Sequence, residues 1–502
     1  MSENAFSKEE EEEEKEQVIQ SEFKEANELS KQIQEEDMEK SNESESEIKN
    51  FVQFGCWNNL NKKKGKQLGC LRSVMTNLQD YLYKNNHVDA ILVSGDNYYP
   101  EKQKIDDKKK KIIHTNLLQE GFDLLPEEKP IYMIFGNHDL ETNQGNEDNS
   151  LYNKDEMEVP GSCKILDLEM EVKRKNVHYD IYKELAVTGG LLLMLDTSMY
   201  EKDKKVQEYL PCYQEYYKKR YPDAGVNIRS VEDVRILQKT YIEETFQKRK
   251  ISGKDLNHVI LVGHHPIVQN RVKEKKNKDK DKDKDKKDKK DKDKKDKKKE
   301  KGLLESEIVS GGGEGDQQWE KLTLSDIIEK FKSVLELIYE KATEINEDVK
   351  FYYLCSDLHL YQTGTVTMET DRSEKMVIEQ YIVGTGGTEL DPAYHSKTEA
   401  PDFEPPRIDM KYPDKVTYIM KTDIAQCGFL AVNLKEGALP EFVPHLIEQQ
   451  EVVKTGGTVR RPRRQKFSRV LRKQKSRKLQ KGGKKYSFKN KKSNKNKSKK
   501  YF

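Results

Sequence analysis

The sequence predicts an α/β fold. Short apolar runs that are typical of buried strands alternate with longer segments whose apolar residues recur at helical spacing. The run at 88–94 consists mostly of Val, Ile, Leu and Ala, as expected for a strand that is covered on both faces. Several runs end in a glycine followed by polar residues. Because ligands of α/β folds bind at the carboxyl ends of strands, these polar residues are candidates for a functional site.

The predicted elements alternate along the chain. The first strand is expected at 51–54, and the helix after it has Leu71, Val74, Leu78 and Leu82 at helical spacing. Further strands are predicted at 88–94, 132–135, 190–195, 258–262, 351–354, 376–383 and within 418–434. Further helices are predicted near 117–125, 231–247 and 322–345. Residues 141–180 are polar and irregular, which indicates a surface insertion.

Charged residues make up 36% of the chain, but they are concentrated in three tracts. Residues 1–50 are acidic and are predicted to be disordered or to form a transient charged helix or coiled coil. Residues 273–301 are almost purely Lys and Asp, so the insert at 268–318 is predicted to contain a disordered, solvated loop. The basic tail at 451–502 is also predicted to be disordered. One folded domain is therefore expected, at 51–450.

The formal net charge of +2 gives no reason by itself to expect a polyanionic partner. The distribution of charge matters more, because 454–502 carries many Lys and Arg residues and neither Asp nor Glu. This stretch is either a solvated tail or an attachment to nucleic acid or another acidic surface. The two interpretations have equal weight, because basic tails of this kind are common and unspecific.

The six cysteines are scattered along the chain without CxxC pairs. The acidic N-terminal region has no apolar signal-peptide core, and the apolar runs fall far short of the roughly 20 residues that span a bilayer. We therefore expect a soluble intracellular protein in a reducing setting, with free thiols, no signal peptide and no membrane span.

Five strand ends carry residues that can bind a metal ion or transfer a proton. Any one of them could be an ordinary polar turn, but five in order, each after an apolar strand, are hard to explain as turns. These residues are Cys56, then Asp96 with Tyr99, then Asn137 with His138, then His264 with His265, and last Asp357 with His359.

This series of motifs resembles the calcineurin-like metallophosphoesterase superfamily, and most closely its purple acid phosphatase branch. The matching motifs are Gly95-Asp96-Asn97-Tyr98-Tyr99, Gly136-Asn137-His138-Asp139 and Gly263-His264-His265-Pro266. The resemblance covers about 51–440 apart from the inserts. It implies a four-layer αββα sandwich of two mixed sheets flanked by helices.

The resemblance also implies two divalent or trivalent metal ions, of iron, zinc or manganese. Asp96 would bridge the two ions. Tyr99 and His359 would bind the first ion, with Tyr99 as the phenolate that favours ferric iron. Asn137 and His264 would bind the second ion.

The resemblance implies that His138, Asp139 and His265 have roles other than binding a metal ion. His138, held by Asp139, would be the acid that protonates the leaving alkoxide. His265 is expected to lie behind the metal ligands.

The sequence departs from the family pattern at two metal ligands. The first motif has Cys56 where the family has Asp, and the last has Asp357 where the family has His. Asp357 and His359 keep the spacing that sends both side chains to one side of an extended segment, so Asp357 can still bind a metal. Cys56 is a doubtful ligand: its thiolate would favour zinc or iron, but a small buried thiol that binds nothing is slightly favoured.

The resemblance implies a metal-dependent phosphoric ester hydrolase, an acid phosphatase-like phosphomonoesterase that uses two metal ions and a histidine acid on a phosphate ester. The alternative is a catalytically degenerate phosphoesterase fold that serves as a binding or scaffold protein through its charged tails. The altered ligands favour the alternative, and the retained histidine acid favours the enzyme.

Overall fold

The computed structural model describes residues 47–60, 62–63, 66–67, 69–99, 119–141, 176–221, 227–270, 322–391, 407–410 and 416–447. The described residues all belong to one unit of the chain, Met1–Gln449. Nearly all of the acidic segment 1–50, most of the insert 268–318 and the whole basic tail lie outside them. Their disorder, and the domain boundaries, stay predictions.

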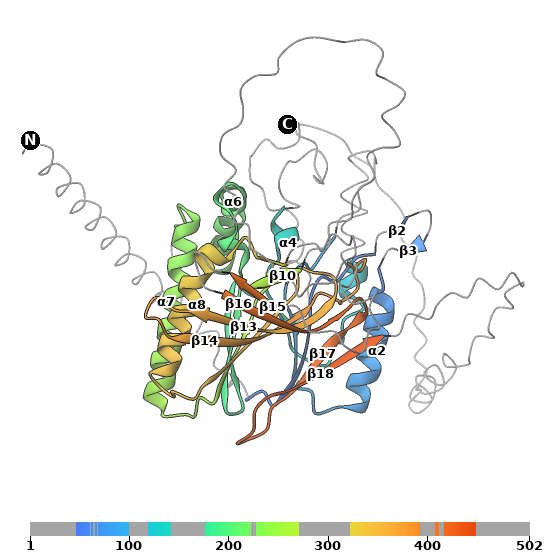
Figure 1. Cartoon of the computed structure of the whole chain (residues 1–502). Coiled ribbons are helices and arrows are strands. Elements are labelled where there is room, and N and C mark those ends of the chain that lie inside the picture. Colours follow the sequence, from blue (N-terminus) through green and yellow to red (C-terminus); the bar gives the residue numbers. More distant parts are fainter. Residues whose placement is uncertain are drawn as a thin grey trace, which may run out of the picture. The chain divides into compact units, whose positions relative to one another are not determined.

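The first of two large sheets has six strands in the order β18-β17-β1-β4-β5-β6. Figure 1 shows β17 and β18 side by side. Its parallel strands are β1 (Asn50–Phe54), β4 (Ala90–Val93), β5 (Ile131–Met133) and β6 (Val177–Tyr179). Its antiparallel strands are β17 (Cys427–Asn433) and β18 (Glu441–Ile447). The sheet is therefore mixed, with a parallel half that ends at one common edge.

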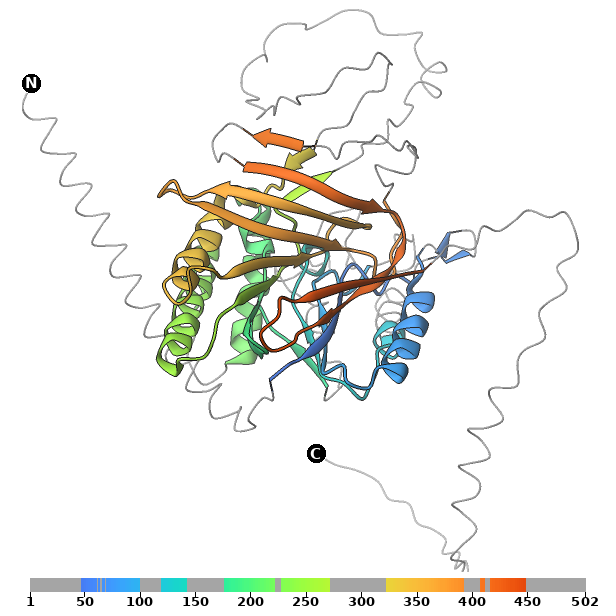
Figure 2. The same ribbon diagram turned by 60° about the horizontal axis from the view of Figure 1, so that its bottom comes forward.

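The second sheet has eight strands in the order β15-β16-β13-β14-β12-β9-β8-β7. Its parallel centre consists of β8 (Gly190–Leu195), β9 (His258–Val262), β12 (Lys350–Cys355) and β14 (Lys375–Val383). Its antiparallel strands are β7 (Tyr182–Val187), β13 (Tyr361–Glu369), β15 (Arg407–Met410) and β16 (Val416–Ile424). Figure 2 shows the long antiparallel strands, in yellow to orange, running side by side.

Two small two-stranded sheets lie outside the large sheets. One pairs β2 (Lys62–Lys63) with β3 (Lys66–Gln67), and the other pairs β10 (Val268–Asn270) with β11 (Leu322–Leu324). In the second of these sheets, the two strands lie on either side of 271–321 in the sequence, the range that contains the Lys/Asp-rich stretch.

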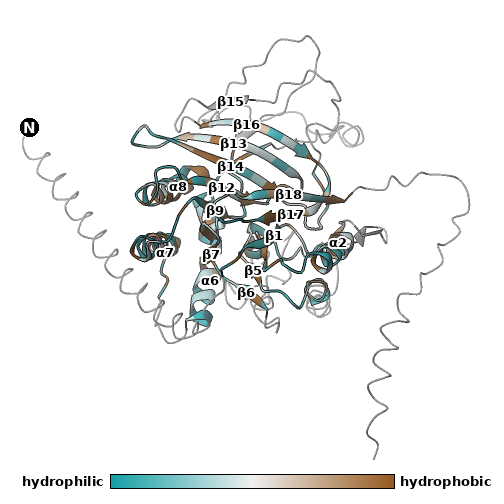
Figure 3. Ribbon diagram, turned by 90° about the horizontal axis from the view of Figure 1, so that it is seen from below, coloured by the Kyte–Doolittle hydropathy of each residue, from teal (hydrophilic) through white to brown (hydrophobic). Residues whose placement is uncertain are grey.

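Helices cover the outer faces of the two sheets (Figure 3). Helix α2 (Leu71–Lys84) packs against the six-stranded sheet, and α6 (Asp203–Arg220), α7 (Val231–Ser252) and α8 (Ile328–Thr343) pack against the eight-stranded one. Two shorter helices are α4 (Asn137–Glu141) and the 3₁₀ helix η2 (Ser198–Tyr200).

Alternation of side chains along the strands builds the layers. On β1, Phe51 points into the core between the sheets and Val52 into the core under α2. On β8, Leu192 belongs to the core between the sheets and Leu193 to the core under α6, α7 and α8. Since both faces of these strands are buried, their sequences are continuous apolar runs. The predicted α/β class with two mixed sheets and flanking helices is confirmed.

Some elements differ from the sequence prediction. The segment 141–180, predicted to be irregular throughout, contributes β6 to the first sheet. The helix predicted at 322–345 begins only at Ile328, because Leu322–Leu324 form β11. The longer elements that form where none was expected include α6, β7, β13 and β18. Helix α6 was missed because it contains Pro211 and buries tyrosines rather than aliphatic residues. Strand β18 was missed because it is only half-buried and contains Pro444, which is tolerated at a sheet edge.

The prediction that the cysteines are free thiols is wrong for at least three of them. Cys70, just before α2, forms a disulfide with Cys427 at the start of β17, and the pair is separated by 357 residues in sequence. Cys212 is also disulfide-bonded. Free cysteines within the described residues are Cys56 and Cys355. A search of the helices within these residues finds none that is long and apolar enough to cross a membrane.

Candidate metal centre

The predicted site residues come together where the two sheets meet. They follow the carboxyl ends of β1, β4, β5, β9 and β12, which are all parallel strands. Backbone and side-chain hydrogen bonds join the loops across the sheets: Gly55 N donates to Val383 O at 3.0 Å, and Ser356 Oγ donates to Ser94 O at 2.6 Å. The loops are therefore held at fixed positions relative to one another.

Three of the site residues have a left-handed backbone. The φ angles are 50° at Cys56, 55° at Asp96 and 60° at Asp357, each within three residues after its strand. Residues other than glycine rarely adopt this conformation, although Asp tolerates it better than most. Such strain costs on the order of 1–3 kcal/mol per residue and clusters at functional sites.

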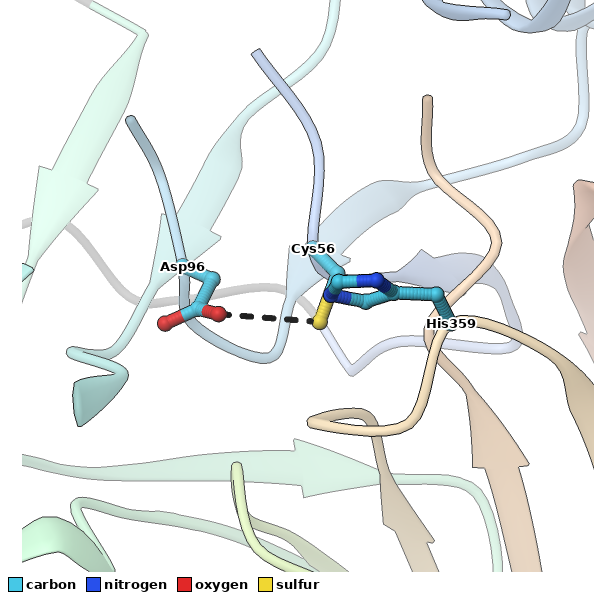
Figure 4. Close-up of side chains that lie close together, drawn as sticks. All are labelled: Cys56, Asp96 and His359. Carbon is cyan, nitrogen blue, oxygen red and sulfur yellow. Dashed lines mark hydrogen bonds between the residues drawn. The ribbon is translucent and has the colours of Figure 1, made fainter. Parts of the chain in front are cut away.

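The first group of donor atoms comes from Cys56, Asp96 and His359, and these atoms lie within 4.8 Å of one another (Figure 4). The Sγ of Cys56 lies 3.8 Å from Asp96 Oδ2. The hydroxyl of Tyr99 donates to the same Asp96 oxygen at 2.6 Å and lies 3.3 Å from His359 Nε2. Four side chains thus lie close together, and that they bind a metal ion stays a prediction.

The second group surrounds the ring of His264. Its Nε2 lies 3.1 Å from Asn137 Oδ1, 3.3 Å from Asp96 Oδ1 and 4.0 Å from Asp357 Oδ1. Its Nδ1 lies 2.9 Å from the carbonyl oxygen of Ser94. Since a carbonyl oxygen only accepts hydrogen bonds, Nδ1 carries the ring hydrogen, and Nε2 of the neutral ring carries a lone pair. Burial lowers the pKa of His264, which keeps the ring neutral.

The second group therefore brings four hydrogen-bond acceptors together. A nitrogen lone pair, an amide oxygen and two carboxylate oxygens repel one another unless a cation lies between them. Zinc binds such atoms at about 2.0–2.2 Å, so the ligands of one ion lie about 3–4 Å apart. The separations around His264, and those around Asp96 in the first group, are of this size. The donor atoms of both groups fit a metal ion.

Asp96 is the residue shared by the two groups, because Oδ1 faces His264 and Oδ2 faces Tyr99. It is buried, and its Oδ1 also accepts from the backbone N of His138 at 3.0 Å. Burial by itself raises the pKa of Asp96, but the positive charges that His264 and His138 carry when protonated, together with the Tyr99 hydroxyl, outweigh it and lower the pKa to about 2. The position suits the predicted bridging role.

His138 lies half-buried beside Tyr99, with the two ring centroids 4.9 Å apart. Its neighbour Asp139 is buried and accepts hydrogen bonds from Asn97 N at 2.7 Å, from Asn97 Nδ2 at 2.8 Å and from Gly136 N at 2.8 Å. Burial, helped by the charge of Asp96, raises the pKa of Asp139 to about 7. These bonds join the loops after β4 and β5. That Asp139 also orients His138 stays a prediction.

His265 lies beside the second group, with a ring nitrogen within 4.8 Å of donor atoms of His264 and Asp357, and its ring also contacts residues behind them. Its Nδ1 lies 3.0 Å from Thr197 Oγ1, and its Nε2 lies 3.4 Å from Glu201 Oε1. Burial by itself lowers the pKa of His265, but the hydrogen bond and charge of Glu201 outweigh it and raise the pKa. Thr197 Oγ1 also accepts from the backbone N atoms of His264 and His265 at 3.2 and 3.0 Å, so it fixes the loop that carries both rings.

Several supporting residues were not predicted from the sequence. Ser94 and Ser356 bond the ring of His264, and Asp391 Oδ2 accepts from the backbone N of His359 at 2.8 Å. Ser94 and Ser356 lie directly beside the predicted motifs in the sequence, so their supporting role could have been predicted from that position. Asp391 lies 32 residues after His359, and nothing local marks it.

Comparison with known proteins agrees with the fold. Residues 49–288 match the family model described as calcineurin-like phosphoesterase. This range contains the motifs after β1, β4, β5 and β9, and the loop after β12 lies beyond it. No curated protein matches the chain.

Among solved structures, the chain is similar to one titled "GAP50 the anchor in the inner membrane complex of Plasmodium". The identity is 12%, the match covers 81% of this chain and 91% of that one, and the TM-score is 0.30, too low to carry an argument. Proteins of the matching family usually bind divalent metal ions. Residues 49–288 are therefore similar to the calcineurin-like phosphoesterases, and the two-sheet architecture is consistent with the metallophosphoesterase fold.

Proposed function

We propose that the protein is a metal-dependent phosphoric ester hydrolase that acts on a phosphomonoester and resembles the purple acid phosphatases. The observation that carries the proposal is the lone pair of His264 Nε2, which faces oxygen atoms of Asn137, Asp96 and Asp357 across 3.1–4.0 Å. A buried arrangement of acceptors without a cation is costly. Asp96 links this position to the first group, because its Oδ1 faces His264 and its Oδ2 faces Tyr99.

The proposed donors form two sets that share Asp96. Tyr99 and His359 would hold the first ion, together with Asp96 and the nearby thiol of Cys56. Asn137, His264 and Asp357 would hold the second. Two such ions, when bound, neutralise phosphate charge and favour in-line displacement at phosphorus by water.

His138 is the proposed proton donor to the leaving alkoxide. It is partly exposed at the first turn of α4, where its backbone N is tied to Asp96 and its ring lies against Tyr99. A side chain held in this way next to the reacting group contributes about 10²- to 10⁴-fold to the rate as a general acid.

The proposal is tested by metal analysis of the purified protein and by hydrolysis of a chromogenic aryl phosphate with iron, zinc or manganese. We expect bound metal and measurable turnover, and the double variant Asp96→Asn/His264→Ala is expected to lose both. His87→Ala, which changes an exposed histidine in the turn between α2 and β4, is the matched control. A metal-free protein without turnover under all three metals contradicts the proposal.

A second candidate function is a non-catalytic binding or scaffold protein that keeps the phosphoesterase fold. The observation that favours it is Cys56, which replaces a carboxylate and whose pKa is raised by burial and by the charge of Asp96. The basic stretch 454–502 would then be a working part. Removing 454–502 is expected to abolish salt-sensitive binding to nucleic acid or acidic surfaces, and retained binding rejects that role.

The compartment is also a proposal. The Cys70–Cys427 disulfide favours an oxidising environment over the reducing intracellular setting that the scattered cysteines suggested.

A further inference from the structure

Cys56 is held in place by its backbone. Its N donates to Gly95 O at 3.1 Å, and its carbonyl oxygen accepts from Thr388 N at 3.3 Å. With the left-handed φ of 50°, these contacts fix the direction of the side chain, and the Sγ lies 3.8 Å from Asp96 Oδ2 (Figure 4). The thiol is fully buried. Its position among the donors of the first group is therefore set by the fold.

The other free thiol of the described chain provides a contrast. Cys355 is equally buried, but its Sγ lies 3.5 Å from the backbone carbonyl of Tyr381 on the neighbouring strand β14. That contact belongs to the packing of the sheet. Of the two thiols, Cys56 is the one that lies within 4.8 Å of a carboxylate oxygen and an imidazole nitrogen that can bind the same ion.

The chemistry of this donor set differs from that of the second group. The first group combines sulfur, nitrogen and carboxylate oxygen, with the Tyr99 hydroxyl 2.6 Å from Asp96 and 3.3 Å from His359. Zinc is commonly bound by such mixed sets in tetrahedral sites. A thiolate is a soft ligand and disfavours magnesium, calcium and manganese. The second group offers nitrogen and oxygen atoms only.

We propose that Cys56 is a metal ligand and makes the first position a zinc-selective thiolate site, unlike the position that Asn137, His264 and Asp357 surround. The inference rests on the proposed function in one respect, since it needs the centre to bind metal. The inference goes beyond the proposed function because it gives the two metal positions different metal preferences. The zinc ion would connect the loops after β1, β4 and β12, because one ligand comes from each.

Cobalt(II) tests this directly, because a thiolate bound to cobalt gives a sulfur-to-metal charge-transfer band in the near ultraviolet. The metal-stripped full-length protein is titrated with cobalt, and wild type is expected to show the band. Cys56→Ser is expected to lose the band while it still binds cobalt at the second position. Its zinc affinity at the first position is expected to fall by about 10- to 100-fold or more, because loss of a residue that only supports a ligand already has this effect. Cys355→Ala is the matched control and is expected to keep the band.

A second variant covers the case in which Cys56→Ser does not fold. Cys56→Asp restores a carboxylate in a backbone conformation that Asp tolerates, and it is expected to shift the preference of the first position from zinc toward manganese or iron. An unchanged zinc-over-manganese preference in Cys56→Asp contradicts the inference.

The remaining outcomes separate the two proposals. Wild-type protein that binds two cobalt ions without the band overturns the thiolate assignment and leaves the proposed function standing. A band that persists in Cys56→Ser also overturns it. Wild-type protein that binds no cobalt overturns both proposals together.

Discussion

The Nε2 atom of the His264 ring lies 3.3 Å from the Oδ1 atom of the Asp96 carboxylate. Neither of these two atoms carries a hydrogen, because the ring is neutral and the carboxylate is ionised. The tautomer follows from the bond between His264 Nδ1 and the carbonyl of Ser94. Two buried acceptors at this distance repel each other. A bound cation removes the repulsion, so metal binding and folding stability are expected to be linked.

Removing metal is therefore expected to destabilise the protein. An ion present at 100 times its dissociation constant stabilises the folded state by about 2.7 kcal/mol, and chelation removes that contribution. The measurement is thermal unfolding of the metal-loaded protein with and without a chelator. In Asp96→Asn/His264→Ala the chelator is expected to have little effect. A melting temperature of wild type that does not respond to the chelator contradicts a buried metal centre.

The acid role of His138 predicts a split between catalysis and metal binding. His138→Ala is expected to lower kcat by about 10²- to 10⁴-fold, because the general acid is lost. Its metal content is expected to be unchanged, because the ring of His138 packs at a tilt against that of Tyr99 and the hydrogen bond to Asp96 is made by the backbone N of His138. Kinetics on an aryl phosphate and metal analysis are run side by side, with His87→Ala as control. Unchanged turnover removes His138 from the mechanism.

The parts of the fold that the sequence predicted are those with local patterns. Strands β1, β4, β9 and β12 are buried on both faces and are written as continuous apolar runs, and each is followed by a motif. Helix α6 has no such pattern. Its buried side chains include Tyr209 and Tyr213, whose hydroxyls donate to Glu201 and Asp196, so its core side looks polar in the sequence.

Long-range relationships could not be predicted from local patterns. The partner of Cys70 lies 357 residues away, and disulfide connectivity does not follow from sequence alone. The same holds for Asp391, which contacts the backbone of His359 through the fold. The position of Cys56 among the first-group donors also needed the structure, because only the fold shows where the thiol points.

The disulfide is expected to contribute to stability. Cys70 and Cys427 join α2 to β17 across most of the chain, and removing a native disulfide typically costs about 2–5 kcal/mol. Cys70→Ser/Cys427→Ser is therefore expected to unfold at lower denaturant concentration than wild type. Cys355→Ser, which removes a free thiol, is the control for the loss of cysteine as such. Equal midpoints for wild type and the double variant under non-reducing conditions contradict this expectation.

His258 is expected to make the stability depend on pH. It is buried at the start of β9, and neither ring nitrogen has a hydrogen-bond partner among the described residues. Burial, together with the charge of Arg249, lowers the pKa of His258 from 6.5 to about 4. The unfolded chain therefore takes up a proton at a higher pH than the folded protein.

The direction in which folding stability changes with pH follows from this difference in proton uptake. The stabilisation is fully present above pH 6.5, it is lost progressively as the pH falls from 6.5 to about 4, and no further loss comes from this residue below that. A shift of this size corresponds to a few kcal/mol. Denaturant unfolding of wild type and His258→Leu across this range measures the effect. The variant is expected to lose less stability than wild type between the two values, and parallel pH profiles contradict the role of His258.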